Sequence, residues 1–155
     1  MGKEWRYVSY PFMRKKSCLV DYEIITDSLT TKIGDCISVT RNDHKYKEIT
    51  QILQKIQPLA YHANGSVRGR LAIFAEDLSW VDEVYDEFVE RAGEAIHQFV
   101  LPQGSDVATT LHICRSEAKK SYRALHKVSE EREVPEILFQ LFGILANVFF
   151  VLSVE

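Results

Sequence analysis

The sequence predicts an all-α fold, a five-helix bundle formed by one domain of residues 19–155. Apolar side chains recur at steps of three and four along most of the chain, the spacing at which residues share one face of a helix. A length of 155 residues, 46% of them hydrophobic, is enough to bury one core. Because the sequence contains no repeat, low-complexity segment or evident linker, a second domain is not expected.

The first half of this domain contains two predicted helices. Residues 1–18 show no periodic pattern, and we expect an irregular N-terminal segment there. Helical spacing begins in residues 19–39, although β-branched side chains lower the helix propensity of this stretch. A second helix follows Asp43, whose side chain is a good N-cap, and Gly65 is a fitting end for it. Pro58 lies inside this second pattern, so we expect the helix to be kinked or shortened there.

The second half contains three more predicted helices. Residues 77–97 place apolar side chains on one face and acidic side chains on the other. After a Pro-containing turn, Ser105 is a good N-cap for the fourth helix. Pro135 begins the last helix, where proline is tolerated. Residues 137–154 of this helix carry no charge and are about long enough to span a bilayer. We favour a buried helix of the bundle, or of an oligomer interface, over a membrane anchor.

The composition argues against several classes of partner and compartment. The formal net charge is −3, which gives no general reason to expect nucleic acid as a partner. The three cysteines are far apart in the sequence, which is typical of reduced thiols in a cytoplasmic protein. No apolar segment follows the first residues, so no signal peptide is predicted. None of the five histidines has a partner at the spacing of a known metal motif, and we predict no metal site.

The most informative stretch is the turn at residues 99–105 and the helix that follows it. Arg115, Lys119 and Arg123 are spaced four residues apart, so they form a basic stripe on one helix face. With Phe99 just before the turn, they predict an apolar wall beside an anion-binding wall, which suits a large flat ligand next to a phosphate. Two interpretations of the stripe remain open. It is either a solvated face, or a site in which Arg115 pairs with a buried carboxylate and the other cations face a phosphate.

The segment from Phe99 to Ser116 resembles the trimeric helix-bundle ATP:cob(I)alamin adenosyltransferases, also called corrinoid adenosyltransferases. It reads Phe-Val-Leu-Pro-Gln-Gly-Ser and later Leu-His-Ile-Cys-Arg-Ser. The family has an aromatic residue before a Leu-Pro-Gly-Gly turn, and then a helix with Leu-His and Ala-Arg-Thr. Residues 26–34 look like the family's Val-Asp-Glu-Leu-Asn-Ser motif on the first helix. The resemblance covers roughly residues 20–155.

On the corrinoid side, the resemblance implies specific roles. The family's aromatic residue helps to displace the lower axial ligand of cobalamin, and Phe99 matches it. In that family, an aspartate of the first helix pairs with the Ala-Arg-Thr arginine, and Asp27 and Arg115 match this pair. We therefore expect these three residues to be catalytic. Leu101 and His112 lie in the matching turn and Leu-His motif, and the resemblance implies that they bind the corrinoid too.

On the nucleotide side, the chain departs from the family. Residues 1–20 contain nothing like the family's Thr-Lys-Thr-Gly-Asp loop, which wraps the ATP phosphates. Lys119 and Lys120 replace paired arginines, and a lysine holds phosphate as a point charge without the bidentate fork of arginine. These two lysines and Arg123 are the cations expected to meet the nucleotide. The basic residues 14–16 are candidates to replace the missing loop.

The resemblance implies transfer of the 5′-deoxyadenosyl group from ATP to cob(I)alamin, with ATP and magnesium required if the protein is catalytic. The alternative is a non-catalytic paralogue that binds a corrinoid or another protein and has lost ATP binding. A homotrimer is implied, because in that family the ligands sit between neighbouring subunits. A cobalamin-dependent enzyme or a reductase is a further expected partner in the cytoplasm, whereas neither nucleic acid nor a membrane is expected.

Overall fold

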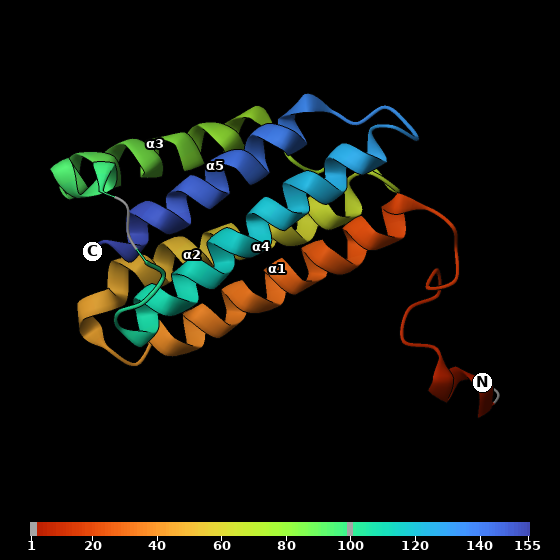
Figure 1. Cartoon of the computed structure of the whole chain (residues 1–155), viewed down its shortest axis with the longest axis horizontal. Coiled ribbons are helices and arrows are strands. Elements are labelled where there is room, and N and C mark those ends of the chain that lie inside the picture. The colour runs from red at the N-terminus through yellow and green to blue at the C-terminus, as the bar shows by residue number, and fades with distance from the viewer. Residues whose placement is uncertain (1–2, 99–100) are drawn as a thin grey trace.

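The computed structural model describes residues 3–98 and 101–155 and contains five α-helices (Figure 1). They are α1 (Cys18–Thr40), α2 (Lys47–Gly65), α3 (Ala75–Ala92), α4 (Asp106–Val128) and α5 (Glu136–Ser153). Short 3-10 helices cover Lys3–Tyr7, His44–Tyr46 and Gly93–His97. The described residues contain no strand, and the predicted all-α, five-helix fold is confirmed.

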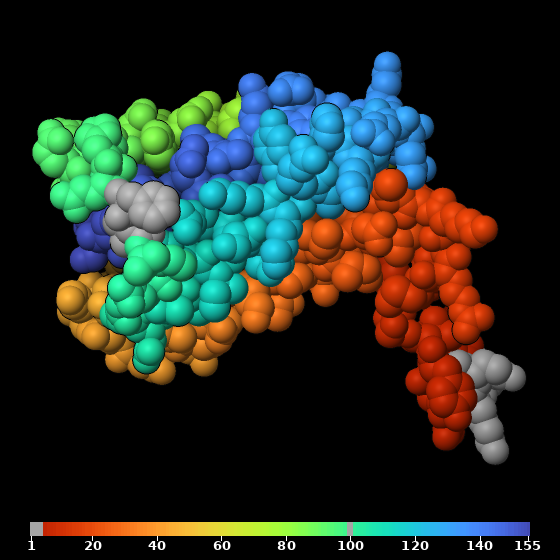
Figure 2. Space-filling view, in the orientation of Figure 1, coloured from red at the N-terminus to blue at the C-terminus, as the bar shows by residue number. Residues whose placement is uncertain are grey.

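The five helices lie lengthwise beside one another, with α4 between α1 and α5 (Figure 1). The helix α2 packs against α1, and α3 packs against α5. Figure 2 shows the N-terminal segment extending away from one end of the bundle, whereas the C-terminus lies at the other end in Figure 1. The N-terminal segment therefore lies at the end of the bundle where α1 begins.

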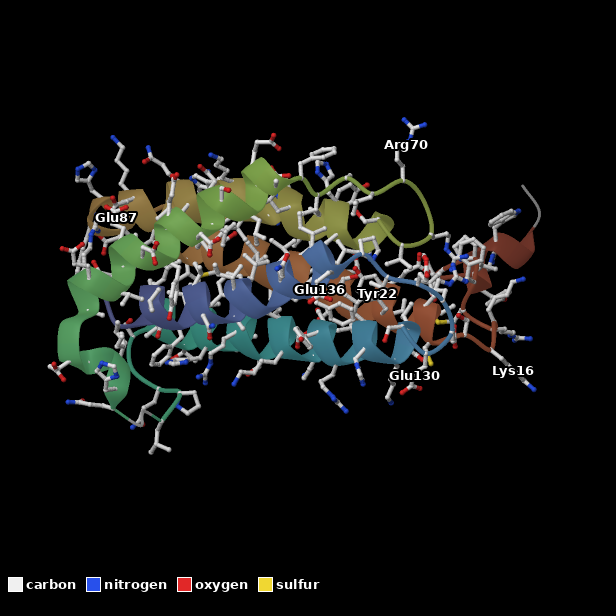
Figure 3. All side chains as sticks on the ribbon, turned by 90° about the horizontal axis from the view of Figure 1, so that it is seen from above. Lys16, Tyr22, Arg70, Glu87, Glu130 and Glu136 are labelled. Carbon is white, nitrogen blue, oxygen red and sulfur yellow. The ribbon has the colours of Figure 1, made fainter. Side chains whose placement is uncertain are left out.

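A buried tyrosine joins three helices in the core. The side chain of Tyr22 on α1 is fully buried, and Figure 3 places it inside the bundle. Its hydroxyl donates a hydrogen bond of 2.6 Å to the carbonyl oxygen of Ala63 in α2. The ring meets Phe142 of α5 edge-on, with 6.0 Å between the ring centroids. An unpaired buried hydroxyl would cost about 1–3 kcal/mol, so this hydrogen bond allows an aromatic side chain to fill the centre.

Local capping signals set several helix ends, and the sequence predicts those at Ser105 and Gly65. The Ser105 hydroxyl accepts a hydrogen bond of 3.1 Å from the backbone N–H of Ala108 and caps α4. The Ser17 hydroxyl accepts one of 3.1 Å from the N–H of Leu19 and caps α1. Gly65 is the last residue of α2, as expected. These ends depend on side chains within a few residues, so the sequence alone identifies them.

The third predicted helix is two elements instead of one. The sequence predicts a helix over residues 77–97, but α3 ends at Ala92 and a 3-10 helix follows. The break falls at Gly93, whose φ is +57°, a left-handed conformation that glycine adopts without steric cost. The apolar periodicity continues through this break, which is why the sequence suggests a single helix.

The predicted shortening of the second helix at Pro58 is wrong, because α2 runs without interruption to Gly65. The proline removes one backbone hydrogen bond and crowds the preceding turn. Ile56 and Leu59, on either side of it, are buried in the core. Tertiary packing of this apolar face therefore outweighs the local cost of the proline.

The helix α5 is long and apolar enough to cross a membrane, judged by length and composition alone. Half of its residues are buried inside the bundle, where it packs against α4 and α3. It is therefore a core helix of this fold. Phe139 and Phe150 lie on one side of α5 and are only half-buried in the single chain, which leaves part of an apolar face uncovered.

Candidate functional site

The outer face of α4 carries the predicted basic stripe. Lys119, Lys120 and Arg123 are exposed, and Lys127 continues the row by one turn. These four cations line a groove of about 510 Å³ between α1 and α4. Its other lining residues are Cys18, Asp21, Ile25 and Ala124. With four cations and one carboxylate, the groove favours an anionic ligand.

A second hollow, of about 490 Å³, adjoins the groove at the N-terminal end of α1. The two hollows share Cys18, Asp21 and Ile25, so they adjoin each other along α1, and we call the two together the cationic groove. Lys15 and Lys16 line its N-terminal part. Figure 3 shows Lys16 at this end of the bundle. The basic residues of the N-terminal segment and those of α4 thus line adjoining parts of the cationic groove.

Glu131, in the loop between α4 and α5, fixes the entry of the chain into α1. Its carboxylate accepts a hydrogen bond of 2.8 Å from the backbone N–H of Cys18 and one of 2.9 Å from the hydroxyl of Ser17. These hydrogen bonds, led by that of the backbone N–H, lower the pKa of Glu131. The carboxylate is therefore charged at neutral pH. It attaches the N-terminal segment to the loop that follows the C-terminal end of α4.

A third hollow, of about 370 Å³, lies between α4 and α5. Tyr122 and Phe142 contribute aromatic rings to it, and Lys119 and Arg123 line both this hollow and the cationic groove. The rest of the lining is Gly143, Ala146 and Asn147. Lys119 and Arg123 therefore lie at the border between the largely apolar hollow of α4 and α5 and the cationic groove. This apolar surface comes from α4 and α5, whereas the predicted apolar wall at Phe99 lies outside the described residues and stays a prediction.

Two buried polar atoms on α4 lack a partner. The Nδ1 atom of His112 and the Nε atom of Arg115 have no hydrogen-bond partner among the described residues. Both side chains lie by Phe150 of α5, at 6.5 Å between ring centroids for His112 and at 5.7 Å from the Arg115 Cζ to the ring centroid. Burial, and then the charge of Arg115, lower the pKa of His112. Buried polar atoms are usually paired, so these two point to a group from outside the single chain.

The predicted ion pair of Asp27 with Arg115 is not formed within the chain. Asp27 is exposed, not buried, and no ion pair in the described parts of the chain joins the two. On α1, Thr26 and Leu29 face the core. Because each helical residue is rotated by about 100° from the one before, Asp27 points outward. The interpretation that a buried carboxylate of the same chain neutralises Arg115 is therefore corrected.

The turn before α4 is described only in part. Phe99 lies outside the described residues, so its role stays a prediction. Leu101 is 61% exposed, and Gly104 has a φ of +129°, which favours glycine at this point of the turn. An exposed leucine side chain beside a glycine turn is available to contact a ligand or a neighbouring subunit.

Several residues of the cationic groove were not among the sequence candidates. Lys127 carries a signal that could have identified it, because it follows Arg123 at the same interval of four. Asp21, Ile25 and Glu131 carry none, since they reach the groove only through the packing of α1 on α4. In the ranges that the structure describes, no group of three or more His, Cys, Asp or Glu side chains is placed to hold a metal ion.

Solved structures share this fold. A variant of the PduO-type ATP:corrinoid adenosyltransferase from Lactobacillus reuteri, complexed with cobalamin and ATP, matches with a TM-score of 0.79 and 18% identity. The match covers 90% of this chain and 77% of that chain. Another variant of that enzyme, complexed with ATP, gives a TM-score of 0.81 and 19% identity over 90% of this chain and 81% of that chain. At these identities the likeness establishes the fold.

Sequence comparisons extend the likeness to the family. A corrinoid adenosyltransferase of Bacillus subtilis (strain 168) is 24% identical over an alignment of 141 residues, and the match covers 88% of this chain and 72% of that protein. The family profile described as cobalamin adenosyltransferase matches residues 8–155. This match covers nearly the whole chain and includes α1 to α5. The protein therefore belongs to the cobalamin adenosyltransferase family.

Proposed function

We propose that this protein transfers the 5′-deoxyadenosyl group of ATP to cob(I)alamin. The observation that carries the proposal is the cationic groove beside the apolar hollow of α4 and α5, with Lys119 and Arg123 lining both. Membership of the family supports this reaction. The Lactobacillus reuteri variant of the same fold is complexed with both cobalamin and ATP. The alternative of a non-catalytic paralogue rests on the departures from the family on the nucleotide side, and the comparisons give it no support.

The reaction requires a site that stabilises a departing triphosphate. A carbon–cobalt bond forms at C5′ of ATP, and the bond from C5′ to the triphosphate oxygen breaks with its electron pair leaving on the triphosphate. Lys119, Lys120 and Arg123 supply positive charge where that charge develops. A preorganised contact of this kind is worth about 2.7–4 kcal/mol in a water-excluded site, and less where side chains are exposed, as here. Several cations acting together offset this weaker individual effect.

The N-terminal lysines complete the phosphate site in this proposal. Lys15 and Lys16 line the part of the cationic groove beside the start of α1, next to the part lined by the cations of α4. They take the place of the family's Thr-Lys-Thr-Gly-Asp loop, which this sequence does not contain. Magnesium would enter with the ATP phosphates, which are the usual ligands for this ion together with water and one or two carboxylates.

The corrinoid side involves a second subunit. Asp27 points out of its own chain, and the Nε atom of Arg115 lacks a partner. We therefore place Asp27 against the partner subunit's Arg115 in a homotrimer. From the resemblance, Phe99 stands below the corrinoid and displaces its lower ligand, while Leu101 and His112 contact the ring. The uncovered apolar face of α5 supports assembly, because such a face is stable when it is covered.

The reaction also bears on partners and location. Cob(I)alamin is a strongly reduced substrate, so a reductase must supply it or deliver electrons while cob(II)alamin is bound. A cobalamin-dependent enzyme would then consume the adenosylated product. We propose a cytoplasmic location, in keeping with the three free thiols, Cys18, Cys36 and Cys114.

The test is the formation of adenosylcobalamin from ATP and chemically reduced cobalamin, followed by visible absorption with magnesium present. The variants Lys119→Gln and Arg123→Gln should each raise the KM for ATP, and lower kcat/KM by roughly tenfold to a hundredfold. Lys47→Gln removes the same charge from the exposed start of α2, away from the groove, and should leave both constants unchanged. Absence of turnover in the wild-type protein would refute the proposal.

A further inference from the structure

A buried carboxylate fixes an arginine where the N-terminal segment meets the bundle. Arg68, in the connection between α2 and α3, donates two hydrogen bonds to Glu23 of α1. They run from Nε to Oε2 at 3.0 Å and from Nη2 to Oε1 at 2.8 Å. The Glu23 side chain is only 5% exposed. A bidentate pair of this kind fixes both the position and the plane of the guanidinium group.

The guanidinium group of Arg68 also packs against an aromatic ring of the N-terminal segment. The Cζ atom of Arg68 lies 3.9 Å from the centroid of the Phe12 ring. Tyr10 meets Phe12 edge-on, with ring centroids 5.6 Å apart. Both rings are half-buried, whereas residues 13–16 are exposed. Burial, and then hydrogen bonding to Glu23, raise the pKa of Tyr10, in keeping with its place beside the same carboxylate.

The segment between these rings and α1 is thus attached at both ends. Phe12 rests on Arg68, and Ser17 is held by Glu131. Residues 13–16, Met-Arg-Lys-Lys, span the interval, and Lys15 and Lys16 among them line the cationic groove. A short segment with two fixed ends has few conformations to lose when a ligand binds, so its cations are already near their working positions.

We propose that Arg68 is a positioning residue for the nucleotide, because it holds Phe12 and thereby keeps Lys15 and Lys16 at the cationic groove. This rests on the proposed function, in which that groove binds the triphosphate. Arg68 does not line the groove, so it acts through the segment that it holds. If the segment is released, only a fraction of molecules presents both lysines at any moment, and the apparent affinity for ATP falls by that fraction.

The experiment compares Arg68→Gln with Arg70→Gln. Arg70 lies in the same loop and points into solvent in Figure 3, and no ion pair or hydrogen bond of its side chain occurs among the described contacts. Each variant removes one charge. The first readout is trypsin cleavage after residues 14–16, followed by mass spectrometry of the intact chain. The second is the KM for ATP and for the corrinoid in the turnover assay.

Arg68→Gln should increase cleavage at residues 14–16 roughly tenfold, and raise the KM for ATP by a similar factor with the corrinoid KM unchanged. Arg70→Gln should match the wild-type protein in both readouts. Because Arg68→Gln leaves Glu23 without its partner, Phe12→Leu serves as a second variant. Phe12→Leu removes the aromatic ring that packs on Arg68 and leaves the pair of Arg68 with Glu23 intact. It should therefore reproduce the effects of Arg68→Gln.

The results separate this inference from the proposed function. If the variants at Arg68 and Phe12 behave like Arg70→Gln in cleavage, or are cleaved faster without any change in the KM for ATP, the positioning role is overturned. Absence of turnover in the wild-type protein refutes the nucleotide site itself. The cleavage rates depend only on the attachment of the segment, so they remain informative in that case.

Discussion

At the scale of single residues, the buried polar groups divide into those paired within the chain and those without a partner. Tyr22 and Glu23 are paired with groups of α2 and of the loop after it. His112 and Arg115 each keep one buried nitrogen unpaired. The interval of four predicts the basic stripe because it is a property of one helix. The sequence cannot reveal that Arg115 has no carboxylate partner among the described residues, because this depends on the direction in which Asp27 leaves α1.

The buried imidazole of His112 predicts a specific pH dependence of stability. Its pKa in the folded protein is lowered below the ordinary value of 6.5, so the unfolded chain binds a proton more readily. The free energy of unfolding should therefore fall as the pH drops from above 6.5 through the folded-state pKa. A variant His112→Gln should lack this decrease.

Urea unfolding at several pH values between 7.5 and 5.5 provides the measurement. Glu48 and Glu131 have pKa values lowered below 4.5, so the stability that they contribute is lost only at more acidic pH and does not interfere. The same pH slope in the variant and in the wild-type protein would show that another group is responsible.

At the scale of helices, the ends that the sequence predicts are those with a local cause. Ser105 caps α4 and Gly65 ends α2, as expected. Pro58 is different, because the packing of its neighbours overrides its effect on α2. The cationic groove belongs to this scale too, since it exists only where α1 packs on α4. Helix spacing predicts one wall of such a groove, and the partner helix remains unknown until the fold is known.

The half-buried apolar face of α5 predicts self-association. The wild-type protein should sediment as a trimer, and Phe139→Glu, on the face that Phe139 shares with Phe150, should shift it toward the monomer. Full burial of a phenylalanine side chain contributes about 1.5–3 kcal/mol, and a charge at the same place opposes burial. Gln140→Glu adds the same charge at an exposed position of α5 and should leave the trimer intact. A wild-type protein that sediments as a monomer at all concentrations would exclude this role of α5.

At the scale of the whole molecule, the residues of the proposed phosphate site lie together in the single chain, whereas the proposed corrinoid site requires a neighbouring chain. Lys15 and Lys16 reach the cationic groove because Arg68 and Glu131 hold the N-terminal segment at two points. Asp27, in contrast, is exposed to solvent on α1, whereas the Nε atom of Arg115 is buried on α4, so the two side chains do not meet within the described part of one chain. The resemblance in the turn before α4 identifies the family from a few residues, but the relation of these two side chains depends on assembly, which no local pattern encodes.

The most direct test of the central claim, that this protein holds a corrinoid next to ATP, is a visible-absorption titration of cob(II)alamin with the protein. With saturating ATP, the protein should change the cob(II)alamin spectrum, because removal of the lower axial ligand alters the cobalt centre. The change should be smaller for Phe99→Ala, and Lys119→Gln should require more ATP to produce it. A spectrum that the wild-type protein leaves unchanged, with and without ATP, would contradict the account.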